Sequence, residues 1–80
     1  MKFDFQVDER FSFGEIQILM TLQKGIVTEA EVYTDALDTE IAAKVCDALR
    51  GVRFDTADMA EALGGAGFAE LSEYFRKLDL

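Results

Sequence analysis

The apolar residues of this chain change their spacing once, and that change limits the folds open to it. From residue 3 to about residue 35 they alternate with polar residues, as in strands that bury one face. From about residue 39 onward they recur at helical spacing, as on one side of a helix. Strands followed by helices are typical of an α+β domain, in which helices pack on one face of an antiparallel sheet. We therefore expect about three strands and then about three helices.

The alternating part of the chain predicts strands near residues 3–7, 11–22 and 26–35. Gly14 interrupts the second of these, and the apolar residues shift from odd to even positions across it. One inserted residue would produce that shift, which predicts a β-bulge at Gly14. The sequence Gln-Lys-Gly at residues 23–25 predicts a three-residue hairpin loop with a G1 bulge, because its last glycine accepts a positive φ.

Alternation also predicts which side chains of the sheet meet the core. We expect Ile18 in the second strand and Val32 in the third to be buried. Glu29 and Glu31 occupy the opposite parity of the third strand, so that side should face water. Tyr33 shares this parity, and its ring is expected to cover an edge of the sheet.

The helical spacing predicts three helices, near residues 39–50, 56–63 and 68–78. No internal repeat, low-complexity tract or proline-rich linker divides the chain, so we expect one domain over residues 1–80. Several residues mark the expected helix ends. These are the N-cap candidates Asp38 or Thr39 and Asp55 or Thr56, the C′ residue Gly51, and the closing pair Gly64 and Gly65.

Charge and composition exclude several classes of function. Sixteen carboxylates against eight cations give a net charge of −8, which disfavours binding to nucleic acid or to an anionic membrane surface. No apolar run approaches the roughly 20 residues of a transmembrane helix. The chain start has no signal-peptide pattern, and its single cysteine cannot form an intrachain disulfide. A cytoplasmic protein is expected.

The sequence offers no recognisable catalytic, cofactor-binding or metal-binding residues. It contains no histidine, which excludes a Ser-His or Cys-His nucleophile and a histidine-ligated zinc. Cys46 lies in mid-helix beside an acidic residue, so we expect a small packed side chain. The aspartate pairs in residues 35–38 and 55–58 lack the spacing of a calcium loop. The glycine-rich residues 64–67 follow a helix and lack a Lys-Ser or Lys-Thr pair, which indicates a flexible loop.

Four short motifs occur in a distinctive order. Together they resemble the C-terminal accessory domain of lipoate–protein ligases, and the resemblance extends over roughly residues 8–63. The glycines fall at the expected bulge, hairpin turn and helix end, where a side chain is disfavoured, so the motifs indicate fold more directly than chemistry. The matched residues are Arg10, Phe11 and Gly14; Lys24 and Gly25; Tyr33 and Asp35; and Leu49, Gly51 and Phe54.

The resemblance implies a function shared with a larger partner. Ligases of this family use ATP and Mg²⁺ to convert lipoate to lipoyl-adenylate, and then transfer the acyl group to a lysine of a lipoyl carrier domain. Their catalytic lysine and their nucleotide- and lipoate-binding loops belong to a large domain, on which this chain would dock. Arg10 and Lys24 are our candidates for docking contacts, because they are cations beside matched motifs of an acidic chain; plain solvated charges would look the same.

Some alternatives stay open at this point. Met1 opens the chain a few residues before the first motif, as expected of a separate small subunit, although an excised fragment would look the same. The acyl group could be lipoate or octanoate, and the carrier protein is not identified. A stand-alone α+β interaction module unrelated to lipoate, or a small enzyme with an unrecognised site, would also fit the composition. Dependence on a large ligase domain would favour the first hypothesis.

Overall fold

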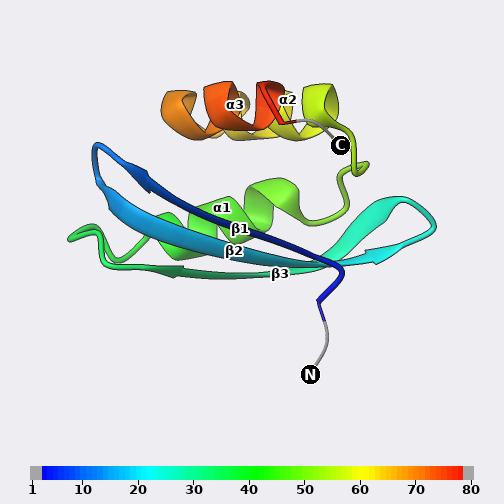
Figure 1. Cartoon of the computed structure of the whole chain (residues 1–80), viewed down its shortest axis with the longest axis horizontal. Helices are drawn as coiled ribbons and strands as arrows, with labels where there is room; N and C mark the ends of the chain where they lie inside the picture. Colours follow the sequence, from blue (N-terminus) through cyan, green and yellow to red (C-terminus); the bar gives the residue numbers. More distant parts are fainter. Residues whose placement is uncertain (1–2, 79–80) are drawn as a thin grey trace.

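Three strands and then three helices make up the computed structural model, which describes residues 3–78 (Figure 1). The strands form an antiparallel sheet in the order β1-β2-β3, so the α+β prediction is confirmed. Within the described residues, no helix is both long and apolar enough to cross a membrane. The elements are β1 (Phe5–Phe11), β2 (Gly14–Gln23), β3 (Ile26–Thr34), α1 (Ile41–Leu49), α2 (Thr56–Gly65) and α3 (Ala69–Arg76).

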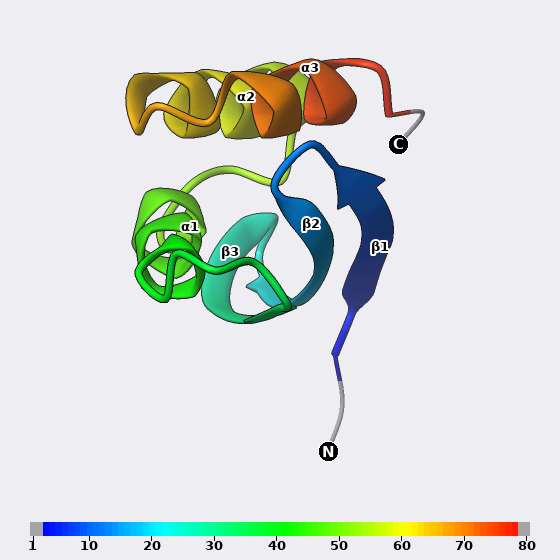
Figure 2. The ribbon, with the colours of Figure 1, turned by 90° about the vertical axis from the view of Figure 1, so that its left-hand side faces the viewer.

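All three helices lie on one side of the sheet. Figure 2 shows α1 beside β3, and α2 with α3 above β2 and β1. The opposite side of the sheet carries no helix within the described residues, and we call it the open face (Figures 1 and 2). A half-covered antiparallel sheet places apolar side chains on one side and polar side chains on the other, which is the alternation seen in the sequence.

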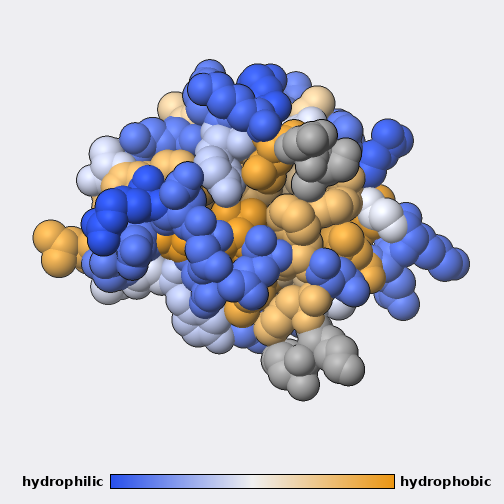
Figure 3. Space-filling model, in the orientation of Figure 1, coloured by the Kyte–Doolittle hydropathy of each residue, from blue (hydrophilic) through white to orange (hydrophobic). Residues whose placement is uncertain are grey.

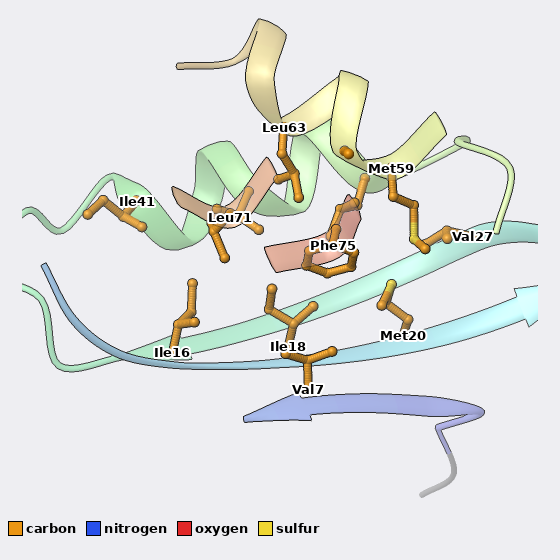
Figure 4. Packing of buried hydrophobic residues seen from close by; sticks show 13 residues of the cluster. Val7, Ile16, Ile18, Met20, Val27, Ile41, Met59, Leu63, Leu71 and Phe75 are labelled. Carbon is orange, nitrogen blue, oxygen red and sulfur yellow. The ribbon is translucent and has the colours of Figure 1, made fainter. Parts of the chain in front are cut away.

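The core lies between the sheet and the helices. Figure 4 shows side chains of β2, with Ile18 at their centre, pointing toward Phe75 of α3 and Leu63 of α2. Each fully buried side chain of this size contributes about 1.5–3 kcal/mol through removal of apolar surface from water. The buried apolar residues are Val7, Ile16, Ile18, Met20, Val27, Ile41, Val45, Leu49, Met59, Ala60, Leu63, Leu71 and Phe75.

Half-buried apolar side chains extend this core to the surface. They include the aromatic rings of Phe5 and Phe11 in β1 and of Tyr74 in α3. Figure 3 shows apolar surface along the course of β1, surrounded by hydrophilic side chains. The small size of the domain accounts for this, because a chain of this length cannot enclose all of its apolar residues.

The first hairpin differs from the prediction. Phe11 pairs with Gly14, which leaves only Ser12 and Phe13 in the loop, and residues 8–10 belong to β1. The bulge predicted at Gly14 is therefore wrong. The shift from odd to even positions has another cause, which is the register of the hairpin. Each odd-numbered residue of β1 pairs with an even-numbered residue of β2, as Val7 does with Ile18, and paired residues lie on the same side of the sheet.

The second hairpin is tighter than predicted. Gln23 pairs with Ile26, so the loop has two residues rather than three. Both loop residues have positive φ, 55° at Lys24 and 79° at Gly25, as a type I′ turn requires. This turn matches the right-handed twist of the two strands that it joins.

The bulge lies in β3 instead. Thr21 pairs with Glu29 and Leu22 with Val27, which leaves Thr28 as the extra residue. Between this bulge and the turn, the odd-numbered residues of β3 face the core in place of the even-numbered ones. Val27 is therefore fully buried.

The predicted burial of the sheet side chains is right in part. Ile18 is fully buried, whereas Val32 is only half-buried, because it lies in β3 at the edge of the sheet. Glu29 is exposed and Glu31 is half-exposed, and neither is in the core. Tyr33 is exposed, as its parity predicted.

The helix ends follow the predicted capping chemistry with small shifts. The Asp55 carboxylate accepts a hydrogen bond from the Asp58 amide at the start of α2. Gly51, with φ +83°, follows α1 as its C′ residue. Helix α1 begins later than predicted: Glu40 holds its N-cap position without a side-chain bond, and Asp38 caps the preceding turn through the Glu40 amide at 3.0 Å. Helix α2 includes Gly64 and Gly65 rather than ending before them, and α3 is shorter at both ends than predicted.

Candidate functional site

The four sequence motifs meet in pairs at opposite ends of the sheet. The motif that ends in Gly14 meets the motif that ends in Asp35, at what we call the Gly14 end. The motif around Gly25 meets the motif around Gly51, at the Gly25 end. The two ends are about 30 Å apart, because β2 has 10 residues and a strand rises about 3.3 Å per residue.

At the Gly14 end, one carboxylate holds the start of β2 against the end of β3. Asp35 Oδ1 accepts a hydrogen bond from the Glu15 amide at 2.8 Å, and Thr34 Oγ1 donates to the Glu15 carbonyl at 2.6 Å. A Cβ atom on Gly14 would collide with Asp35 Oδ1, and the φ of Gly14 is +126°. Gly14 and Asp35 therefore form one structural unit, which explains why these residue types occur together.

At the Gly25 end, the chain that leaves α1 pairs with the start of β3. The Gly51 amide donates to the Val27 carbonyl and the Phe54 amide donates to the Gly25 carbonyl, both at 2.7 Å. Leu49 is fully buried just before this segment. These bonds fix the direction of the chain between α1 and α2, so this motif pair is also structural.

Phe11 connects the first hairpin to α3. Its ring contacts Phe13, with centroids 5.5 Å apart, and Tyr74, with centroids 5.6 Å apart at 88°. In the same hairpin, the amide and hydroxyl of Ser12 donate to Glu70 Oε1 at 3.1 and 2.6 Å. The hairpin therefore orients the C-terminal helix of the described residues.

The two candidate docking cations lie at opposite ends of the sheet. Arg10 is on the open face, where its guanidinium lies 3.6 Å from the Glu15 carboxylate. Lys24 is exposed in the loop at the Gly25 end. The structure does not bring them together, and their contact with a partner stays a prediction.

A hollow of about 660 Å³ lies on the open face at the Gly14 end, and sequence reasoning did not find it. It forms where β1, β2 and β3 run side by side, so residues far apart in the sequence line it. The hydroxyl of Tyr33 donates to Glu31 Oε1 at 2.7 Å, and this bond to a carboxylate raises the pKa of Tyr33. The lining residues are Asp8, Glu9, Arg10, Glu15, Ile16, Gln17, Tyr33, Thr34 and Asp35.

The hollow does not fit the anionic groups that the resemblance implies. Its lining includes four acidic residues and one basic residue, which leaves three negative charges (1 − 4 = −3). A nucleotide triphosphate or the carboxylate of lipoate would be repelled there. In residues 3–78, no group of three or more His, Cys, Asp or Glu side chains is arranged to hold a metal ion.

Cys46 has the surroundings of a packed thiol. Its Sγ donates to the Ala30 carbonyl at 3.2 Å, across the contact between α1 and β3. Burial raises the pKa of the Cys46 thiol, and Arg50 offsets this only in part. A raised pKa disfavours the nucleophilic thiolate, so this geometry fits the structural role expected from the sequence.

Element order, motif pairs and hairpin geometry together define a small α+β domain of one particular class. Over residues 1–80 the chain matches the family described as "Bacterial lipoate protein ligase C-terminus", and it belongs to that family. The resemblance drawn from the four motifs is thereby confirmed.

A solved structure shares the fold. It is LipL1 of P. falciparum, solved in complex with lipoate, which superposes with a TM-score of 0.79 at 13% sequence identity. The match covers 98% of this chain and 25% of the LipL1 chain. This chain therefore spans about a quarter of the length of that relative.

Proposed function

We propose that this chain is the accessory domain or subunit of an ATP-dependent lipoate–protein ligase, and that it docks on a separate catalytic domain. The observation that carries the proposal is membership of the ligase C-terminus family over residues 1–80. The acidic hollow adds support, because it is unsuited to ATP or lipoate. In this proposal ATP, Mg²⁺ and lipoate bind to the catalytic domain, and the lipoyl carrier domain is the acceptor.

In this proposal the chain covers the acyl-adenylate and controls the access of the carrier lysine to it. An acyl-adenylate hydrolyses readily, so a ligase gains from a domain that closes over it and excludes water. The same domain must then move so that the carrier lysine can reach the acyl group. A small rigid domain joined to its partner by a docking surface suits both steps. A cytoplasmic location, expected from the sequence, belongs to the same proposal.

The test is reconstitution. This chain alone with lipoate, ATP and Mg²⁺ should give no lipoyl-adenylate, since the negative charge of the ATP phosphates requires surrounding cations, and the hollow has one cation against four carboxylates. Adding the cognate catalytic domain should give strong activation that rises with the amount of this chain and saturates at one equivalent. Lipoyl-adenylate is measured by mass spectrometry, and octanoate in parallel reactions identifies the preferred acyl group.

A catalytic domain that is fully active alone and forms no complex with this chain at micromolar concentrations would overturn the proposal. The chain would then be an α+β interaction module with another partner.

A further inference from the structure

We propose that the open face of the sheet is the surface that docks, and that it meets a basic surface of the catalytic domain which also accepts two apolar side chains. This inference rests on the proposed function and specifies the chemistry of its partner.

The first observation is unbalanced charge on the open face. The strand register places Asp8, Glu15, Glu29 and Glu31 on this face, with Arg10 as the cation among them. Arg10 pairs with Glu15, so the other three carboxylates have no cation within ion-pair distance among residues 3–78. The partner is expected to supply the missing positive charge.

The helical side of the molecule differs. There, cations lie beside carboxylates, as in Lys44 with Glu40 at 3.4 Å and Arg50 with Asp47 at 3.2 Å. The carboxylates of the open face therefore have fewer cations among them than those of the helical side. The open face has one cation for four carboxylates, whereas residues 36–78 have five cations for eight carboxylates.

The second observation is two exposed apolar side chains at the Gly14 end of the sheet, of which Tyr33 lines the hollow. Tyr33 is 55% exposed and Leu37 is 98% exposed, and the other large apolar side chains of residues 3–78 are buried or half-buried. Tyr33 lines the hollow, and Leu37 follows Asp35 by two residues at the same end of the sheet. Apolar anchors beside charges that steer the approach are typical of a protein interface.

The same carboxylates disfavour two other binding partners for the open face, a second copy of this chain and a polyanion. A second copy of this chain docked by two-fold symmetry would place the same carboxylates against one another, and like charges across an interface are unfavourable. A polyanion would be repelled in the same way. A basic protein surface is the occupant that the open face favours.

Charge reversal tests the first observation. Asp8→Lys with Glu29→Lys adds four positive charges to the open face. Glu61→Lys with Glu73→Lys adds the same four to exposed positions on the helical side. Titration calorimetry of the full chain with the catalytic domain should show affinity reduced about tenfold or more for the open-face variant and within about twofold for the control. The open-face variant should also lose the salt dependence of binding.

Leu37 tests the second observation without disturbing the fold, because its side chain contacts so little of its own domain. Leu37→Ser should reduce affinity about tenfold, as truncation of an apolar interface anchor does, whereas Leu37→Met should keep most of it. Thermal melts should coincide for all three proteins.

The outcomes separate this inference from the function on which it rests. If the unmodified chain activates the catalytic domain and both charge variants bind equally well, the docking face is wrong while the function stands. If the control variant alone loses binding, docking uses the helical side and the inference is again wrong. If the unmodified chain neither binds nor activates, the proposed function fails and the inference fails with it.

Discussion

Two separate constraints require glycine at position 14. Its φ of +126° is a conformation that L side chains rarely adopt. Its missing side chain also leaves room for the Asp35 carboxylate, which needs that position to reach the Glu15 amide. The two constraints are independent, so their energetic costs can be separated by mutation.

Gly14→Ala is expected to lower the free energy of unfolding by about 2–4 kcal/mol, from backbone strain together with displacement of Asp35. Gly65→Ala is the matched control: nothing lies within 4 Å of its Cβ position and its φ is not positive, so the change should not lower the free energy of unfolding and should raise it by up to about 1 kcal/mol, since alanine favours a helix over glycine. Urea denaturation followed by circular dichroism measures both.

Asp35→Ala removes the collision but not the strained φ. In the double variant the loss should therefore be smaller than the sum of the two single losses by about 1 kcal/mol. Simple additivity would show that Gly14 and Asp35 act independently, contrary to the geometry described above.

At the scale of elements, the β2–β3 hairpin depends on an unfavourable residue. Lys24 has φ 55° and is the non-glycine residue with positive φ among residues 3–78. Asparagine before glycine is the preferred pair for a type I′ turn. The presence of lysine at this position therefore costs stability.

Lys24→Asn is expected to raise the free energy of unfolding by about 0.5–1 kcal/mol. The same substitution at Lys77, where φ is −94°, should give no gain. Calorimetric binding to the catalytic domain completes the test. A variant that is more stable but binds more weakly would establish Lys24 as a docking contact, and unchanged affinity would remove it from that role.

Local signals in the sequence were sufficient for some elements and not for others. Alternation, the Asp55 cap and the Gly51 helix end are local patterns, and they predicted the type, number and order of the elements correctly, although several bounds differ. The Ser12-Phe13 loop carries no Gly, Pro, Asn or Asp, and the positive φ is supplied by Gly14 after it. The hairpin therefore looked like a bulge in one strand. The bulge at Thr28 leaves no glycine to mark it.

The candidate site was predictable only as motifs. Gly14 and Asp35 could be singled out by resemblance, but their contact depends on strand register, which the misplaced bulge concealed. The hollow is formed by side chains of three strands, and the exposure of Leu37 depends on the path of a loop. Neither has a signal within a short window of sequence.

At the scale of the whole molecule, Phe75 connects layers that are distant in the chain. It is fully buried and reaches from α3 toward Ile18 and Met20 of the sheet (Figure 4). The sheet and the last helix therefore share one core, although 80 residues can build only a small one.

Phe75→Ala is expected to lower the free energy of unfolding by about 3–5 kcal/mol, a large part of the 5–15 kcal/mol typical of a whole domain. Phe75→Leu should cost much less, because it keeps most of the volume. Leu37→Ala, at an almost fully exposed position, should have no measurable effect. Thermal and urea unfolding measure all three. A small loss in the alanine variant would mean that α3 is dispensable to the core.

The placement of the motif contacts at the two ends of the sheet has a consequence for divergence. Each end is held by backbone hydrogen bonds and a few special residues. The positions between them therefore need only keep an apolar residue toward the core and a polar residue on the open face. Such a fold tolerates extensive drift in sequence, which agrees with a TM-score of 0.79 to LipL1 at 13% identity. More remote relatives should therefore be easier to find by the spacing of Gly14, Gly25, Asp35 and Gly51 than by overall identity.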